Sequence, residues 1–349
     1  MGKKFSVKSI GKWLSENIII VLIFLASVFV STQNKNFLSA NNIRNLLSNT
    51  AVRFIIACGV SGCLITKGTD LSAGRVAGLA ACLSGILMQR ANYDQRFYPG
   101  MPEMPLLVVL LIVVALCALI GAVNGSVIAF LKVPPFIATL GMQTLVYGAC
   151  LVYTGAIPIG GLRSDYTGLA TGYVGTRMLS NLTIIAIFIG LFMWFLYNKT
   201  RYGKYMYAIG GNATSANLMG ISTRSATIRI YMLSTGLATL AGIVFSIYTQ
   251  AGYALAGVGV ELDAIASVVI GGTLLSGGVG TVLGTLFGVA IQGLIQTYIN
   301  FDGTLSSWWT KIAIGILLFI FIALQRGLTV LWENRQNAAV TRVSGAGSR

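Results

Sequence analysis

Long apolar runs alternate along the chain with short polar and basic segments. A membrane-spanning helix needs about 20 mostly apolar residues. The runs therefore predict about ten membrane segments, and several are short enough to be broken or re-entrant. The predicted fold is an all-α polytopic membrane helix bundle. Its expected segments are Asn17–Ser31, Ala51–Thr66, Leu71–Gln89, Pro105–Leu131, Phe136–Gly155, Leu182–Tyr197, Thr227–Gln250, Leu262–Ile270, Thr281–Ile299 and Trp308–Leu324.

The composition supports lipid as the main solvent of this chain. Hydrophobic residues make up 55% of the 349 residues and charged residues only 9%, whereas soluble domains carry about 25% charged residues. The first apolar run follows a basic N-terminus as in a signal peptide. No convincing small-residue cleavage site follows it, so we expect this run to remain as the first span.

The net charge of +15 is arranged as a topology signal. Basic residues flank the apolar runs, and such clusters mark the cytoplasmic side of a membrane protein. Both termini are then cytoplasmic, the number of full crossings is even, and nucleic acid is not an expected partner. The predicted organisation is a cytoplasmic segment 1–16, a transmembrane domain 17–325 with a cytoplasmic loop 198–229, and a cytoplasmic tail 326–349.

An internal similarity suggests a repeat. Gly68–Gly74 matches Gly272–Gly278 at glycine, threonine, leucine, serine and glycine, and each segment follows an apolar run and precedes a helix rich in small residues. Transporters are often built from repeats whose Gly-interrupted helices meet near the substrate. Chance similarity between glycine-rich segments is the alternative.

Polar residues within apolar runs are candidates for a solute pathway, because charge in a membrane interior is costly. For Asp70 and Asp263, capping of a helix N-terminus is an equally open interpretation, and Glu261 can lie outside the hydrocarbon. Interhelical hydrogen bonding is the alternative for each amide. A lining of amides and hydroxyls suits a neutral sugar better than a bare ion. The predicted pathway residues are Asp70, Ser72, Asn124, Gln143, Asp263, Ser276, Gln292 and Gln296.

The loop 198–229 holds a predicted short helix, Ala213–Met219, which Asn212 or Thr214 can cap and which Gly220 ends. Its apolar residues Leu218 and Met219 have no membrane to enter. A docking element for a soluble partner explains them, and packing against the rest of the chain is the alternative.

The sequence lacks the residues that several other classes of function require. No Walker pattern occurs, so the chain is not expected to hydrolyse ATP. No paired intramembrane acids or histidine chain indicate a proton relay. The chain has no histidine, and its five cysteines lie in apolar runs without metal-type spacing. An enzyme is not expected, because no nucleophile–base pair or metal cluster is present.

Five ordered motifs resemble the ribose/galactose-type permeases of bacterial ABC sugar importers. They span nearly the whole chain: Gly68–Gly74, Val133–Gly141, Lys199–Lys204, Ala208–Asn212 and Ser276–Gly280. The resemblance implies an ATPase that carries ATP and Mg, a periplasmic sugar-binding protein, a location in the bacterial inner membrane, and no cofactor in this chain. It assigns the ATPase-coupling position to Asn212, Thr214, Asn217, Leu218, Met219 and Gly220.

Two parts of the chain resemble different relatives. Phe37–Tyr153 resembles the galactose/methyl-galactoside permease, whereas the chain from about Tyr207 is closer to a galactofuranose permease. The resemblance therefore leaves open whether a second copy or a paralogous permease completes the transporter. The expected function is import of a monosaccharide, with galactose or a methyl-galactoside ahead of galactofuranose. A secondary sugar transporter driven by an ion gradient is the alternative.

Overall fold

The computed structural model describes residues 39–171, 173–174, 179–302 and 308–324, and six single positions outside these ranges, 28, 31, 32, 37, 306 and 327. The cytoplasmic segment predicted at 1–16 lies outside the described residues, as does almost all of the expected first span, Asn17–Ser31, and of the tail 326–349.

Helices form most of the described chain, and six of those described are long and apolar enough to cross a membrane. The larger helices are α3 (Ala40–Ile65), α4 (Ala73–Leu87), α5 (Leu106–Leu131), α6 (Pro135–Thr154), α8 (Asn181–Lys199), α11 (Thr223–Thr249), α12 (Val260–Ile270), α13 (Val282–Asp302) and the helix Trp309–Leu324. The shorter elements are α7 (Ser164–Thr171), α9 (Arg201–Gly211), α10 (Ala213–Leu218), the 3-10 helix η1 (Ala254–Gly257) and an antiparallel pair of two-residue strands, β1 (Tyr173–Val174) and β2 (Leu179–Ser180).

The predicted all-α bundle is confirmed, and each expected span from Ala51 onward corresponds to a helix. The largest difference is the start of α3, which begins at Ala40 because the Ser39 hydroxyl accepts a hydrogen bond from the Asn42 amide. The polar residues between Ala40 and Ala51 therefore belong to α3. A prediction based on apolar runs alone leaves them outside the helix.

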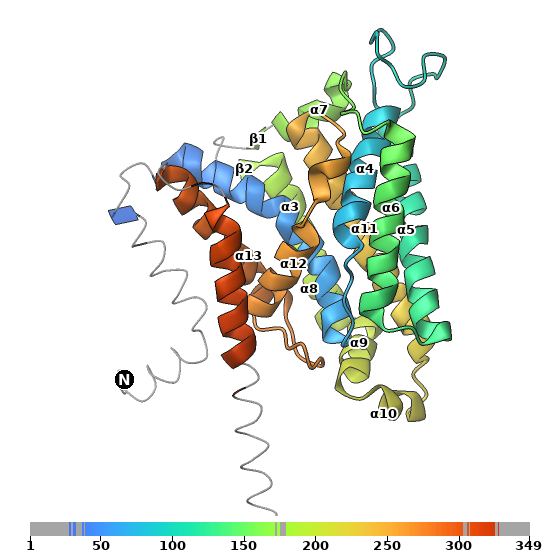
Figure 1. Ribbon diagram of the computed structural model, residues 1–349, viewed down its shortest axis with the longest axis vertical. Helices are drawn as coiled ribbons and strands as arrows, with labels where there is room; N and C mark the ends of the chain where they lie inside the picture. The colour runs from blue at the N-terminus through green and yellow to red at the C-terminus, as the bar shows by residue number, and fades with distance from the viewer. Residues whose placement is uncertain are drawn as a thin grey trace, which may run out of the picture.

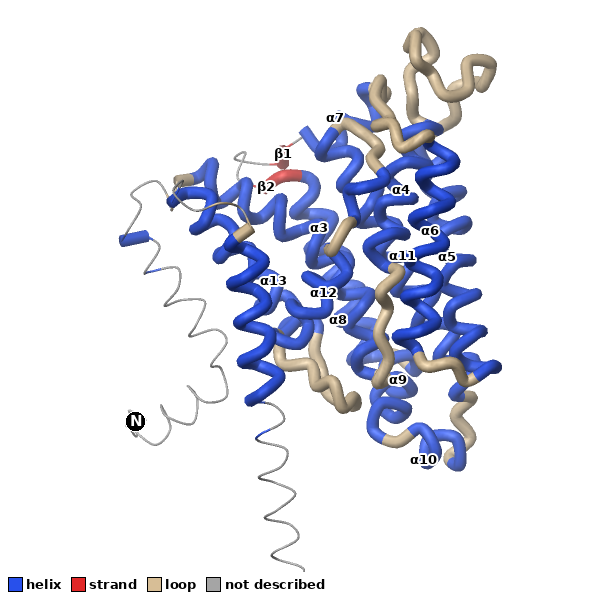
Figure 2. The backbone as a smooth tube through the Cα atoms, viewed as in Figure 1, coloured by secondary structure: helices blue, strands red, loops and turns tan. Residues whose placement is uncertain are grey.

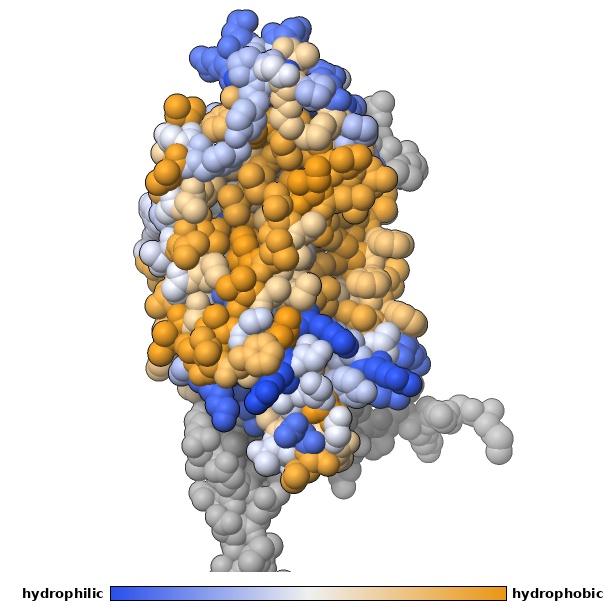
Figure 3. Space-filling model, turned by 90° about the vertical axis from the view of Figure 1, so that its right-hand side faces the viewer, coloured by the Kyte–Doolittle hydropathy of each residue, from blue (hydrophilic) through white to orange (hydrophobic). Residues whose placement is uncertain are grey.

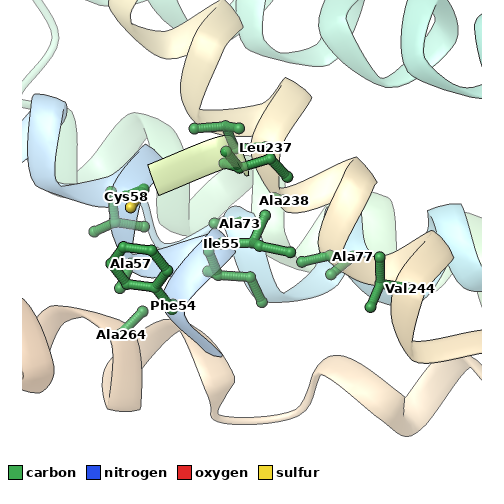
Figure 4. Packing of buried hydrophobic residues seen from close by; sticks show 14 of the residues in the cluster. Phe54, Ile55, Ala57, Cys58, Ala73, Ala77, Leu237, Ala238, Val244 and Ala264 are labelled. Atoms are coloured by element: carbon green, nitrogen blue, oxygen red, sulfur yellow. The ribbon is translucent and has the colours of Figure 1, made fainter. Parts of the chain in front are cut away.

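Helix α11 runs through the middle of the bundle and packs against α3, α4 and α5 (Figure 1). Small residues allow these close contacts: a β-carbon at Gly242 would overlap the carbonyl oxygen of Ala77 on α4, and one at Gly59 would lie 2.9 Å from the carbonyl oxygen of Ser234. Figure 4 shows side chains of α3, α4, α11 and α12 meeting in this core. Small residues bring membrane helices close enough for their backbones to pack.

The bundle has two polar ends separated by an apolar belt. The α7 end carries the loop 88–105, α7 and the strand pair, and the α10 end carries α9 and α10 (Figures 1 and 2). Between them, α5 and α6 expose apolar side chains such as Leu107, Leu111 and Ile137, which form the belt seen in Figure 3. Lipid is the solvent that suits this belt.

The two segments that resemble each other in sequence both lie at non-helical connections. Residues 66–72 connect α3 to α4, and residues 271–281 connect α12 to α13. The two connections lie together, because the Gly278 amide donates to the Ile65 carbonyl over 2.8 Å. Both similar segments, Gly68–Gly74 and Gly272–Gly278, thus lie at a junction between two apolar helices.

Two glycines on α11 test the close packing. Gly242→Ala should destabilise the fold by about 1–3 kcal/mol, because the added methyl group overpacks the α4 contact. The control Gly236→Ala meets nothing within 4 Å and should change stability by less than about 1 kcal/mol, in the stabilising direction. Thermal unfolding in detergent measures both. Equal stability of the two variants would contradict the close α4–α11 packing.

Candidate functional site

Asp70 lies fully buried in the connection between α3 and α4. One carboxylate oxygen, Oδ1, accepts hydrogen bonds from the Ser72 amide at 3.0 Å and the Ser72 hydroxyl at 2.6 Å. The other oxygen, Oδ2, accepts from the Ser234 hydroxyl of α11 at 2.7 Å. Buried charges are tolerated where hydrogen bonds satisfy them, so these three contacts explain how Asp70 can be buried.

A third predicted residue joins the same network. The Asn124 amide of α5 donates to the Ser72 hydroxyl over 2.9 Å. Asp70, Ser72 and Asn124 therefore connect the start of α4 to α5 and, through Ser234, to α11. Ser234 was missed by the sequence analysis, because one serine on a mixed apolar helix gives no signal without its distant partner.

Asp263 lies on the first turn of α12 and forms an ion pair with Lys311 of the last described helix. The lysine Nζ lies 2.7 and 2.8 Å from the two carboxylate oxygens. Gln292 of α13 donates to the backbone carbonyl of Asp263 over 3.0 Å. The backbone carbonyl of Asp263 thus joins α12 to α13, and its carboxylate joins α12 to the last described helix.

Glu261 is buried beside α4 and α6. Its Oε1 accepts from the Gln143 amide at 3.0 Å, whereas Oε2 has no partner among the described residues. Arg75 acts electrostatically on this carboxylate, and its guanidinium stacks over the Tyr147 ring at 4.4 Å. Gln143, a predicted pathway residue, therefore contacts Glu261, an acid that was not among the predicted pathway residues.

The two remaining predicted pathway residues lie apart from these networks. Gln296 lines a cavity of about 260 Å³ between α3, α4, α11 and α13. Ser276 is exposed in the connection between α12 and α13. The structure therefore distributes the eight predicted residues over five places rather than one site.

Helix α10 has the cap that the sequence predicts. The Asn212 side chain accepts from the Ser215 amide at 2.9 Å, and Gly220 ends the segment with a φ of +84°. Ala216 is buried against Ile209 and Ala226. Its position attaches α10 to α9 and α11 and fixes the face that α10 presents outward.

The outward face of α10 is apolar at its tip. Leu218 is 84% exposed and Met219 is 71% exposed, and Figure 3 shows apolar surface at this tip beyond the polar band. Thr214 and Asn217 are also exposed. The alternative that the helix packs its apolar residues on its own chain is wrong for these two side chains.

The α9–α10 segment contacts both non-helical connections. The Lys67 ammonium group donates to the Gly211 carbonyl over 3.1 Å, and the Tyr207 hydroxyl donates to the Gly280 carbonyl over 2.8 Å. A displacement of α10 would therefore act on the segment that leads into Asp70 and on the segment that leads into α13.

Residues 42–322 match the family described as "Branched-chain amino acid transport system / permease component". The chain belongs to this family. No solved structure matches the chain significantly.

Curated relatives extend over nearly the whole chain. The inner membrane ABC transporter permease protein YjfF of Escherichia coli (strain K12) is 59% identical, over 92% of this chain and 94% of the relative. The galactose/methyl galactoside import permease protein MglC of Salmonella typhimurium is 41% identical, over 89% and 94%. The ribose import permease protein RbsC of Escherichia coli (strain K12) is 35% identical, over 92% and 96%. The resemblance carried by the five sequence motifs is confirmed.

The Asp70 network can be tested by removing its acceptor. Asp70→Ala leaves the Ser72 amide and the Ser234 hydroxyl without an acceptor, at a cost of about 1–3 kcal/mol for each group. Asp70→Asn keeps an oxygen for Ser72, and its amide can donate to Ser234, so most stability should remain. Thermal unfolding of the purified variants measures the difference.

The opposite result would change the role of Asp70. If Asp70→Ala unfolds at the wild-type temperature but transport is lost, Asp70 acts on the solute rather than on the fold. Ser234→Ala is the matched control on the α11 side, because it removes one donor and leaves the Asp70 bonds to Ser72 in place.

Proposed function

We propose that this chain is the permease subunit of an ATP-driven importer that moves a monosaccharide into the cytoplasm, with a separate ATPase docked on α10. The observation that carries the proposal is the exposed apolar pair Leu218 and Met219 at a basic, non-membrane end of a family permease. Exposed apolar side chains of this kind are typical of a protein–protein contact.

The charges of the two ends support a cytoplasmic position for α10. The α10 end carries Lys67, Lys132, Lys199, Arg201, Lys204, Arg224 and Arg229, and its described part holds no exposed acid. Cytoplasmic segments are enriched in lysine and arginine. We therefore propose that α9, α10 and both termini lie in the cytoplasm.

The α7 end balances its cations with acids. Arg163 donates to Asp165 and lies 3.9 Å from Glu103. The hydrogen bond from Arg163 holds the pKa of Asp165 below its usual range. We assign this end to the periplasm, where the loop 88–105 and α7 are available to a sugar-binding protein.

The transported sugar is proposed to be galactose or a methyl-galactoside, with galactofuranose next. The galactose/methyl galactoside permeases share 38–41% identity with this chain, and the ribose permeases share 33–35%. A second permease chain, either a copy or a paralogue, completes the membrane part. ATP and Mg belong to the ATPase, so the permease itself needs no cofactor.

The energy source is tested by reconstitution into liposomes. The chain alone should show no sugar uptake under an imposed proton or sodium gradient, because it has no ion relay of its own. Addition of the ATPase, ATP and the loaded binding protein should produce uptake of labelled galactose. Saturable uptake driven by an ion gradient without ATP would contradict the proposal and show that the chain is a secondary transporter.

The docking surface is tested by Leu218→Asp. Burial of one such side chain against a partner stabilises docking by about 1.5–3 kcal/mol, and an unpaired charge in its place costs more than the lost contact. The variant should remain folded in the membrane but lose its ATPase during purification through a tag on the permease.

Ser222→Asp is the matched control for this variant. It adds the same charge to the same loop at the exposed N-cap of α11, where aspartate is well tolerated. It should retain the ATPase. Normal ATPase recovery with Leu218→Asp would place docking elsewhere on the loop.

A further inference from the structure

The cavity beside Gln296 lies inside the helix bundle. Residues of α3, α4, α11, η1, α12 and α13 line it. The contributing part of α3 is its N-terminal half, and that of α11 is its C-terminal half. Both halves point toward the α7 end, so the cavity lies in that half of the belt and reaches the surface at the exposed residues Asn49 and Tyr248.

The polar lining consists of donors and amides without an acid. Ser48, Asn49, Arg53, Gln296 and Tyr248 supply the polar groups, and the carboxylates of Asp70, Glu261 and Asp263 are absent from the wall. Small residues of α4, α11 and η1 complete the lining: Ala77, Ala241, Gly242 and Gly257. Ligand sites commonly combine an apolar wall with a few polar groups.

Arg53 is the one charged residue of this wall, and its place in an apolar helix needs a cause. Asp263 attracts it electrostatically, but the Asp263 carboxylate is already bound by Lys311. The Arg53 guanidinium lines the cavity and carries five N–H donors. This group therefore offers N–H donors that a molecule in the cavity can use.

We propose that this cavity is a sugar-passage site, in which Arg53, Asn49 and Gln296 bond the hydroxyl and ring oxygens of a neutral monosaccharide. The proposal rests on the proposed function and adds the place where the permease contacts the sugar. The rings of Phe245 and Tyr248 provide the apolar face, as aromatic side chains combine an apolar body with, in tyrosine, a polar group. A wall with a cation and no acid also disfavours cationic solutes.

Cysteine labelling tests whether the cavity is open to water. The native cysteines Cys58, Cys63, Cys82, Cys117 and Cys150 are all buried, so their background labelling should be low. Gln296→Cys should react with a charged, membrane-impermeant methanethiosulfonate reagent, as shown by the mass of the protein. The control Ile187→Cys, in the apolar groove between α3, α8 and α13, should stay unmodified because that groove faces lipid.

The same labelled protein tests the passage of sugar. In liposomes that contain the complete transporter, labelling of Gln296→Cys should reduce galactose uptake at least tenfold, and excess sugar with loaded binding protein should slow the labelling. Ile187→Cys should keep its uptake after the same treatment. An unreactive Gln296→Cys, or a fully labelled one with unchanged uptake, would overturn the proposal.

Arg53→Gln separates the role of the cation from the shape of the cavity. The variant should lower galactose uptake at least tenfold while it still co-purifies with the ATPase, and Arg53→Lys should recover part of the uptake because it restores the charge. Wild-type uptake with Arg53→Gln would overturn the proposal. Absence of ATP-driven uptake in the wild-type transporter would instead refute the proposed function, whereas the mass readout of Gln296→Cys reports on the cavity independently.

Discussion

The need to satisfy every backbone amide inside hydrocarbon is the constraint on which this structure depends. Helices meet it internally, so non-helical backbone is possible only where protein surrounds it. The connections 66–72 and 271–281 meet this condition by packing together, with the Gly278 amide bonded to the Ile65 carbonyl. These two interruptions of the helices therefore lie where the two similar segments cover each other.

This junction also relates the ends of the molecule to its interior. Helix α9 lies against both connections through Tyr207, Lys67 and the α9 C-terminus. On the interior side, the first connection leads directly into the buried network of Asp70, Ser72 and Ser234. A force applied at α10 therefore reaches the start of α4 through hydrogen bonds and packed backbone rather than through a flexible loop.

The charged residues of the membrane interior differ in how they are engaged. Asp70 and Asp263 have both carboxylate oxygens engaged by protein groups, so each mainly joins helices. Arg53 differs, because its guanidinium lines a cavity. Asp70 was selected from the sequence because a charge in an apolar run is rare. The same criterion applies to Arg53, which lies within the expected span Ala51–Thr66 but was not selected.

The sequence by itself determined the helical class, the positions of the described spans, the cap and glycine of α10, and the family, because these depend on local apolar runs, turn chemistry and ordered motifs. Only the tertiary structure decided which polar side chains meet. Asp70 and Ser234 are 164 residues apart, and Gln292 and Gln296 share a helix yet contact different surroundings. Such pairings depend on how helices pack, and helix packing is set by small residues on facing surfaces that no single segment reveals.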